Sequence, residues 1–229
     1  PKFNLTVTRG RMSSMDWRRV LIEELSEKPR YEPDWKRPSR RVIAVSTEIA
    51  RQREWPVVVP YYHPSRNERV YEKPRIAIVF DISGAISEES YKMYVEELND
   101  CIKQIEPEEL WVIYCDNEVR SVKHYGWPET MILRPPVGIP RSKGAAAYTP
   151  AFQYIAQRCL GRVKSIVYLT DLRPTEPWDE LNRQLPALFC QTGAKKLLWL
   201  IPLDVREKTL WEPSIGKVIW IPVNAIPKH

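Results

Sequence analysis

Glycine and histidine are scarce in this chain, and the motifs that usually carry them in enzymes are absent. Only 8 of the 229 residues are glycine, and neither G-x-x-x-x-G-K-S/T nor G-x-G-x-x-G occurs. His63, His124 and His229 are isolated, without an H-E-x-x-H or G-x-S-x-G sequence. The sequence therefore argues against nucleotide-loop enzymes, zinc hydrolases and serine hydrolases, and we expect a protein that is not an enzyme.

Paired cysteines and long apolar runs are missing as well. Cys101, Cys115, Cys159 and Cys190 are widely spaced and form no C-x-x-C pair. We interpret them as buried reduced thiols in a cytosol-like compartment, with disulfides or a zinc site as the alternatives. No apolar run approaches membrane-spanning length, and residues 1–5 lack the layout of a secretory signal. A cytoplasmic protein without membrane contact is expected.

Positive charge is confined to one part of the chain. Residues 1–73 hold 16 Lys and Arg against 10 Asp and Glu, whereas the remainder holds 19 against 19. The whole net charge of +6 therefore belongs to the N-terminal third. We expect a basic N-terminal extension over residues 1–73 and an α/β domain over residues 74–229.

The second part alternates between buried strands and amphipathic helices. This alternation predicts an α/β fold with a doubly wound, mostly parallel, Rossmann-like sheet. One antiparallel edge strand is expected at 118–125, hairpinned to the strand before it. Pro186 should bend or end the last helix. The predicted strands cover 76–80, 110–115, 165–169, 196–201 and 218–221, and the predicted helices cover 87–105, 149–158 and 178–189.

The N-terminal third has a different character. Met15–Leu25 has helical spacing, whereas residues 30–41 are basic and broken by prolines. Further prolines at positions 56, 60, 64 and 74 predict an extended segment that lies over the sheet instead of forming a second core.

Two predicted strands end in an aspartate. Five apolar residues precede Asp81 and Ser83, and a similar strand precedes Asp171. Ser87, followed by two glutamates, is typical of a helix N-cap. Open α/β sheets bind ligands at the carboxyl ends of their strands, so this is the expected site. A metal-dependent hydrolase that uses Asp81 and Asp171 is one interpretation, although no nucleophile or histidine accompanies them.

Three segments together resemble a known family. They are Asp81-x-Ser83-Gly84-x-Ile86-Ser87, Gly144–Phe152 and Tyr168–Asp171, in that order. The series resembles the von Willebrand factor A (VWA) domain, and in particular the C-terminal VWA-like domain of bacterial metallopeptidase-type proteins. Asp34-Trp35-x-Arg37-Pro38-x-Arg40-Arg41 also resembles that subfamily.

The resemblance implies a metal-ion-dependent adhesion site, usually for Mg²⁺. Asp81, Ser83 and Asp171 match its ligand positions, and Thr149 is a substitute candidate unless it caps the following helix. Ala85 and Ala146 stand where the family has a second serine and a threonine. We therefore expect a degenerate site that binds metal weakly or not at all. In the alternative interpretation, the acids only cap loops and helices.

The resemblance also implies a protein-interaction module that serves as an adaptor for a MoxR-type AAA+ ATPase. Such a role needs no catalytic residues. The expected contact residues are Ala85, Lys143, Tyr148, Arg173 and Trp178. Trp127, Trp178 and the proline-rich loops would supply the main contacts.

Nucleic-acid binding is the alternative function. Aromatic side chains that stack on bases, interleaved with cations that neutralise phosphates, are typical of single-strand binders. A phage protein acting in the host cytoplasm would fit this interpretation. The candidate residues are Tyr31, Trp35, Lys36, Arg37, Arg40, Arg41, Tyr61, Tyr62 and Arg66.

Overall fold

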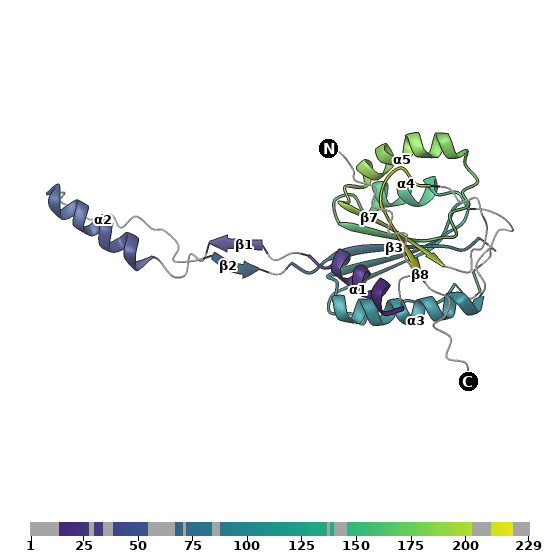
Figure 1. The fold of residues 1–229 in the computed structure, drawn as a ribbon, viewed down its shortest axis with the longest axis horizontal. Helices are drawn as coiled ribbons and strands as arrows, with labels where there is room; N and C mark the ends of the chain where they lie inside the picture. The colour runs from purple at the N-terminus through teal and green to yellow at the C-terminus, as the bar shows by residue number, and fades with distance from the viewer. Residues whose placement is uncertain are drawn as a thin grey trace. The chain divides into compact units, whose positions relative to one another are not determined.

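The computed structural model divides into two units, one of residues 1–26 and 73–229 and one of residues 27–72. The structure describes residues 14–27, 30–33, 39–54, 67–70, 72–83, 88–136, 138–139, 146–202 and 212–221. Figure 1 labels its helices and strands. In chain order they are α1 (Ser14–Leu25), β1 (Arg30–Pro33), α2 (Arg40–Gln52), β2 (Asn67–Val70), β3 (Arg75–Asp81), α3 (Glu88–Ile105), β4 (Glu109–Cys115), β5 (Val119–Gly126), α4 (Thr149–Arg158), β6 (Ser165–Leu169), α5 (Trp178–Thr192), β7 (Lys196–Pro202) and β8 (Lys217–Ile221).

The first unit contains a six-stranded sheet of order β5-β4-β3-β6-β7-β8. Every neighbouring pair is parallel except β4 and β5, which form the expected antiparallel hairpin. The strand order reverses around β3, which lies between β4 and β6. This arrangement confirms the predicted α/β class with a doubly wound, mostly parallel sheet.

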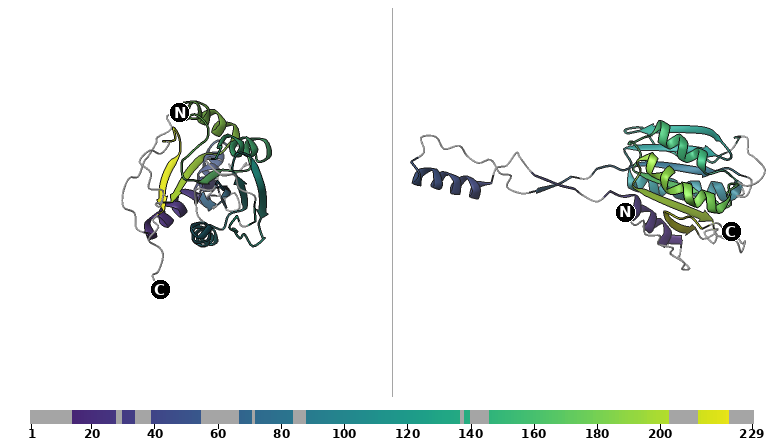
Figure 2. Two further views of the ribbon diagram at one scale, coloured as in Figure 1. Left: turned by 90° about the vertical axis from the view of Figure 1, so that its right-hand side faces the viewer. Right: turned by 90° about the horizontal axis from the view of Figure 1, so that it is seen from above.

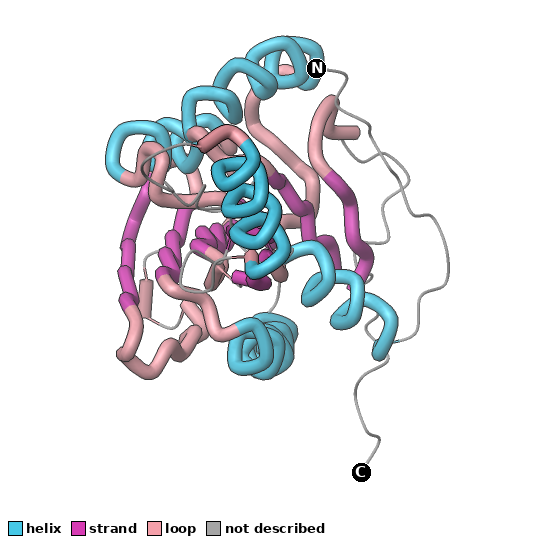
Figure 3. The backbone as a smooth tube through the Cα atoms, turned by 90° about the vertical axis from the view of Figure 1, so that its left-hand side faces the viewer, coloured by secondary structure: helices cyan, strands magenta, loops and turns pink. Residues whose placement is uncertain are grey.

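Helices cover both faces of this sheet (Figures 1 and 2). The strands, magenta in Figure 3, lie between these helical layers. Alternate residues of β3 supply the two cores: Ile76, Ile78 and Phe80 pack with α1 and α3, whereas Ala77 and Val79 pack with α4 and α5. Because successive side chains of a strand point to opposite faces, one continuous apolar run serves both cores.

Helix α1 belongs to the first of these cores. Trp17, Leu21 and Leu25 are buried at helical spacing, and they join α3 and β8 in one hydrophobic cluster. Arg18 adds an ion pair to Glu97 of α3 at 2.8 Å. The unit that contains the sheet therefore includes α1, which was expected in the basic extension, and residues 27–72 form the second unit.

Helix α5 continues past Pro186 to Thr192, so the proline does not end the helix. Proline has no N–H, so the carbonyl of Asn182 loses its partner within the helix. The Ser214 hydroxyl donates to that carbonyl at 3.0 Å, and the Ser214 N–H donates to Asn182 Oδ1 at 2.9 Å. A residue distant in sequence thus satisfies the carbonyl that Pro186 leaves open.

In its described residues, the second unit, 27–72, holds a strand pair and one helix. β1 and β2 pair antiparallel, and α2 begins at Arg40 after Ser39, whose hydroxyl accepts a hydrogen bond from the Val42 N–H at 3.4 Å. The expectation of extended chain is therefore wrong for residues 40–52, where Ser39 and the apolar spacing of Val42, Val45 and Ile49 were the missed helix signal. The prolines at positions 56, 60 and 64 lie outside the described residues.

Three of the four cysteines are buried as expected, and the expectation is wrong for Cys190. Cys101, Cys115 and Cys159 are buried with free thiols, and Cys190 is exposed and also free. Within the described ranges, no helix is both long enough and apolar enough to cross a membrane.

Candidate functional site

The candidate site lies where the strand order reverses, at the carboxyl ends of β3 and β6. Asp81 is the last residue of β3, and Thr170 and Asp171 follow β6 directly. The two strands are hydrogen-bonded neighbours, with α3 on one face and α4 and α5 on the other. Connections that leave toward opposite faces create a crevice at this point, so Asp81 and Asp171 meet as the sequence predicted. We call Asp81, Tyr148, Thr170 and Asp171 the carboxyl-end site.

Asp81 is buried and accepts hydrogen bonds on both carboxylate oxygens. Its side chain is 1% exposed. The Ser83 N–H donates to Oδ1 at 2.9 Å, and the Thr170 hydroxyl donates to Oδ2 at 2.8 Å. Burial raises the pKa of Asp81 to about 6, and the charge of Asp171 adds to the rise, while the hydrogen bonds oppose it. A protonated Asp81 is therefore accessible near neutral pH.

Tyr148 closes the site from the α4 side. Its hydroxyl lies 2.6 Å from the Thr170 hydroxyl, and its ring packs against Tyr168 and Trp199 with centroid distances of 5.1 and 5.8 Å. Its side chain is fully buried, and burial raises the pKa of its phenol well above the ordinary value. Tyr148 was expected to contact a partner, but the structure places it in the interior, so any influence on a partner is indirect.

Glu176 holds the N-terminus of α4 beside Tyr148. Its Oε1 accepts the N–H groups of Tyr148 at 2.9 Å and Thr149 at 3.0 Å. A carboxylate at this helix end satisfies donors that otherwise lack a partner. The N-cap residue is Tyr148, not Thr149, which is the first residue of the helix. The sequence reading missed Glu176, and no local pattern links it to a helix that begins 27 residues earlier.

Arg173 and Trp178 are partly exposed to solvent beside the carboxyl-end site. Arg173 Nε lies 3.5 Å from Asp171 Oδ2, and about a third of the arginine side chain, 36%, is exposed. Trp178, the first residue of α5, is 41% exposed. Both residues were predicted to contact a partner, and both are accessible at this end of the sheet.

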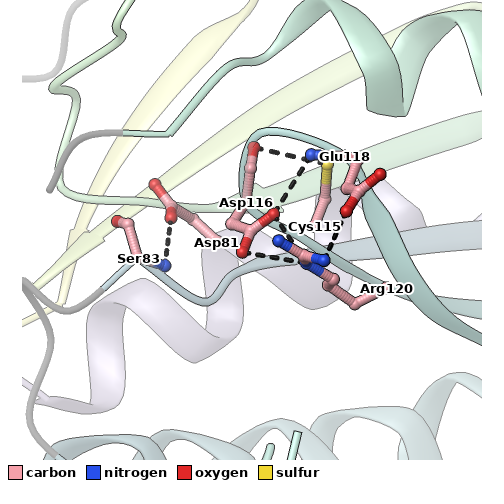
Figure 4. A network of polar contacts seen from close by, with 6 residues as sticks. All are labelled: Asp81, Ser83, Cys115, Asp116, Glu118 and Arg120. Carbon is pink, nitrogen blue, oxygen red and sulfur yellow. Dashed lines mark hydrogen bonds and ion pairs between the residues drawn. The ribbon is translucent and has the colours of Figure 1, made fainter. Parts of the chain in front are cut away.

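A third buried aspartate lies at the end of the neighbouring strand β4 (Figure 4). Asp116 is 0% exposed and receives Arg120 Nε at 3.0 and 3.1 Å. Asp116 follows a buried strand as Asp81 does, but it is not among the site residues predicted from the sequence. Between them, burial and the Asp81 charge raise the pKa of the Cys115 thiol to about 12, which leaves the thiol protonated and unreactive.

The predicted metal ligands differ in how well they suit a cation. Ser83 Oγ is buried beside the Asp81 carboxylate, where a ligand oxygen would lie. The Asp171 carboxylate, in contrast, lies beside the Arg173 guanidinium, and the described contacts of Thr149 do not join it to Asp81 or Asp171. No three His, Cys, Asp or Glu side chains of the described ranges gather as metal ligands. This donor set does not fit Mg²⁺, which requires near-octahedral oxygen coordination.

Several predicted site residues lie outside the described part of the chain. Ala85 and Lys143 of the contact surface belong to this group, and so do most of the basic and aromatic candidates for nucleic-acid binding. Arg40 and Arg41 are described, and both are exposed in the first turn of α2. Of Tyr31, only its place in β1 is described. The candidates outside the described residues are Trp35, Lys36, Arg37, Tyr61, Tyr62 and Arg66.

Comparison with known proteins gives one related sequence and several similar folds. No protein-family profile matches the chain. An uncharacterized protein of Thermotoga maritima is 32% identical over 152 residues, and the match covers 61% of this chain and 33% of the relative's own length. The chain thus spans less than two thirds of that relative.

The similar solved structures include two VWA domains. The SpRpn10 VWA domain has a TM-score of 0.41 at 12% identity, covering 67% of this chain and 90% of that one. The ArnB paralog VWA2 of Sulfolobus acidocaldarius has a TM-score of 0.45 at 12% identity, covering 61% and 37%. Proximal thread matrix protein 1 of the mussel byssus has a TM-score of 0.40 at 12% identity, covering 64% and 41%. These likenesses concern the fold alone.

Proposed function

We propose that this chain is a non-enzymatic protein-interaction module of the VWA type, with its contact surface at the carboxyl end of the sheet. One observation carries the proposal. The acids at this end are buried and bonded within the chain, whereas Arg173 and Trp178 are among the side chains that reach solvent beside them. Inward-bonded acids do not suit catalysis on an external substrate, but a rigid platform with exposed side chains suits binding.

The chemistry of the exposed pair supports a protein partner. Trp and Arg are enriched among residues that dominate binding energies, because they combine a large apolar surface with hydrogen-bond donors. The Asp171 carboxylate restrains the Arg173 side chain, so little additional conformational entropy is lost when a partner binds. The partner surface should therefore offer an acidic group close to an apolar pocket.

The partner that we propose is a MoxR-type AAA+ ATPase, for which this module would serve as an adaptor. This assignment rests on the sequence motifs around Asp81, Pro150 and Asp171 that resemble ATPase-associated VWA-like domains. The chain corresponds to 33% of its Thermotoga maritima relative, so the role of a longer protein is also part of this proposal.

Two exposed tryptophans allow a matched test of the contact surface. Trp178 lies at the carboxyl end of the parallel strands. Trp127, also expected to contact the partner, is 65% exposed but lies at the opposite end, where its backbone N–H donates to the Glu108 carbonyl. Trp178→Ala should weaken binding to a purified MoxR-type ATPase from the same genome by about thirtyfold, as expected for a residue that contributes about 2 kcal/mol. Isothermal titration calorimetry measures the affinity.

In the same titration, Trp127→Ala should leave the affinity unchanged. Equal losses in both variants would mean that the carboxyl end is not the contact surface. An ATPase that does not bind the wild-type chain would remove the adaptor assignment.

Nucleic-acid binding remains a second candidate because of one feature of α2. Arg40 and Arg41 occupy its first turn, which contains no acidic residue. Cations at a helix N-terminus oppose the helix dipole, so helix stability does not explain their presence. A phosphate backbone would compensate for that unfavourable placement.

A single-stranded oligonucleotide tests this candidate. Replacing Arg40 and Arg41 by Ala should reduce the affinity and make the negative slope of log affinity against log salt about 1.4 less steep, because each phosphate contact contributes about 0.7 to its magnitude. Fluorescence anisotropy at several salt concentrations gives the slope. Arg51→Ala on the same helix is the control, because Arg51 is paired with Glu48 at 3.1 Å. An unchanged slope in the double variant would remove nucleic-acid binding through this helix.

A further inference from the structure

Three segments that a bound cation would join are already connected by hydrogen bonds at the carboxyl-end site. They are the end of β3 at Asp81, the segment after β6 at Thr170, and the start of α4 at Tyr148. Thr170 Oγ lies 2.8 Å from Asp81 Oδ2 and 2.6 Å from the Tyr148 hydroxyl. One chain of hydrogen bonds therefore runs through all three segments.

The direction of these hydrogen bonds follows from the capacity of a hydroxyl group. A hydroxyl donates once and accepts twice. Thr170 donates to the Asp81 carboxylate and accepts the Leu172 N–H at 3.1 Å. The Tyr148 hydroxyl must then donate to Thr170, so the bonding capacity of the Thr170 oxygen is filled. The Thr170 hydroxyl has no lone pair left for a metal ion.

The surroundings of the second aspartate also oppose a divalent cation. The Arg173 guanidinium lies beside Asp171, with Nε 3.5 Å from Oδ2. A metal ion at that carboxylate would face a permanent positive charge at short range. The Tyr148 ring fills the space on the α4 side, where it is fully buried against Tyr168 and Trp199.

We infer that the Tyr148 hydroxyl, acting through Thr170, joins α4 to the ends of β3 and β6 and so takes the place of a divalent cation at this site. The inference concerns the assembly of the isolated chain, and it holds whether or not a partner binds there. It goes beyond the proposed function because it explains how an interaction surface of this type persists without metal.

Two neighbouring buried tyrosines provide the experiment. Tyr148→Phe removes a hydroxyl that donates to Thr170, and it should lower the melting temperature by about 3–6 °C through the loss of a buried hydrogen bond. Tyr168→Phe removes a buried hydroxyl that has no hydrogen-bond partner among the described residues, so its melting temperature should stay the same or rise. Equal losses in the two variants would overturn the inference.

A second measurement tests the connection through Thr170. In a Thr170→Val background, Tyr148→Phe should lower the melting temperature only slightly, because the hydroxyl that accepts the Tyr148 hydrogen bond is already absent. Additive losses from the two substitutions would contradict a chain that runs through Thr170.

The same samples test the cation directly. Millimolar Mg²⁺ or EDTA should leave the melting temperature of the wild-type chain unchanged, because a ligand that binds the folded state would raise it. A saturable rise with Mg²⁺ that disappears in Asp81→Ala would show that a metal ion binds here, and it would overturn the inference.

Discussion

Gly216→Ala should be among the most destabilising single substitutions in this chain, with a loss of about 3–5 kcal/mol in the free energy of unfolding. Gly216 precedes β8 and has a φ of +96°, which side chains of L-residues rarely adopt. An added Cβ would lie 2.6 Å from Nε1 of Trp199 and 3.0 Å from the Leu197 carbonyl oxygen. Neither neighbour can move away easily, because Trp199 is fully buried in β7.

Gly161→Ala is the matched control for this prediction. Gly161 also has a positive φ, +72°, but an added Cβ would meet nothing within 4 Å. It should therefore cost only the backbone strain, about 1–2 kcal/mol. Urea denaturation of both variants measures the difference, and equal losses would mean that Trp199 accommodates the methyl group.

The effect of Gly216→Ala should reach the carboxyl-end site through Trp199. The indole N–H donates to the Ile215 carbonyl at 2.9 Å, and the indole ring packs against both Tyr148 and Tyr168. A displaced Trp199 would disturb the position of Tyr148. In the Gly216→Ala background, Tyr148→Phe should therefore cost less stability than it does in the wild-type chain, which double-variant measurements can detect.

Asp81→Asn should remove a pH dependence of stability that the wild-type chain shows between about pH 4 and pH 6. The folded-state pKa of Asp81 is raised from the ordinary value of 3.8 to about 6, chiefly by burial. The folded chain therefore binds the Asp81 proton more tightly than the unfolded chain does. The resulting stability is complete below pH 3.8 and is lost as the pH rises through about 6.

The size of this effect follows from the rise in pKa. A change from 3.8 to about 6 corresponds to about 3 kcal/mol between the two ends of the pH range. Asn keeps the shape of a protonated carboxyl group and does not titrate. The stability of Asp81→Asn relative to wild type should therefore increase by about 2 kcal/mol from pH 4 to pH 7, with the remainder of the change below pH 4. Parallel pH profiles of the two proteins in urea denaturation would contradict the prediction.

The main fold could be predicted from the sequence because its signals are local. The apolar run that ends at Asp81, the helical spacing after Ser87 and the hairpin after Cys115 each lie within a few neighbouring residues. Since parallel strands share one carboxyl end, the same reading also brought Asp81 and Asp171 together. Burial of strand residues on both faces then decided the class of sheet.

Two local signals were misleading for opposite reasons. Pro186 is a helix breaker by itself, yet it leaves open only the carbonyl of Asn182, and Ser214, 32 residues beyond Asn182, satisfies that carbonyl. The prolines on either side of α2 led to a prediction of extended chain, although the segment between them is a short amphipathic helix that Ser39 caps. A helix cap can be predicted from neighbouring residues. A hydrogen bond from a segment distant in sequence, such as that of Ser214 to Asn182, cannot.

The sequence by itself determined the layers of the fold and the two aspartates at the end of the sheet. Only the tertiary structure decided what those aspartates bond to. Asp81 bonds to Thr170, 89 residues away, and Thr170 bonds to Tyr148, 22 residues away. Asp171 pairs with Arg173. Hydrophobic periodicity acts over one turn of helix or one strand, and it therefore specifies elements. A hydrogen bond between buried groups depends on the packing of whole elements, so its partners emerge only when the chain has folded.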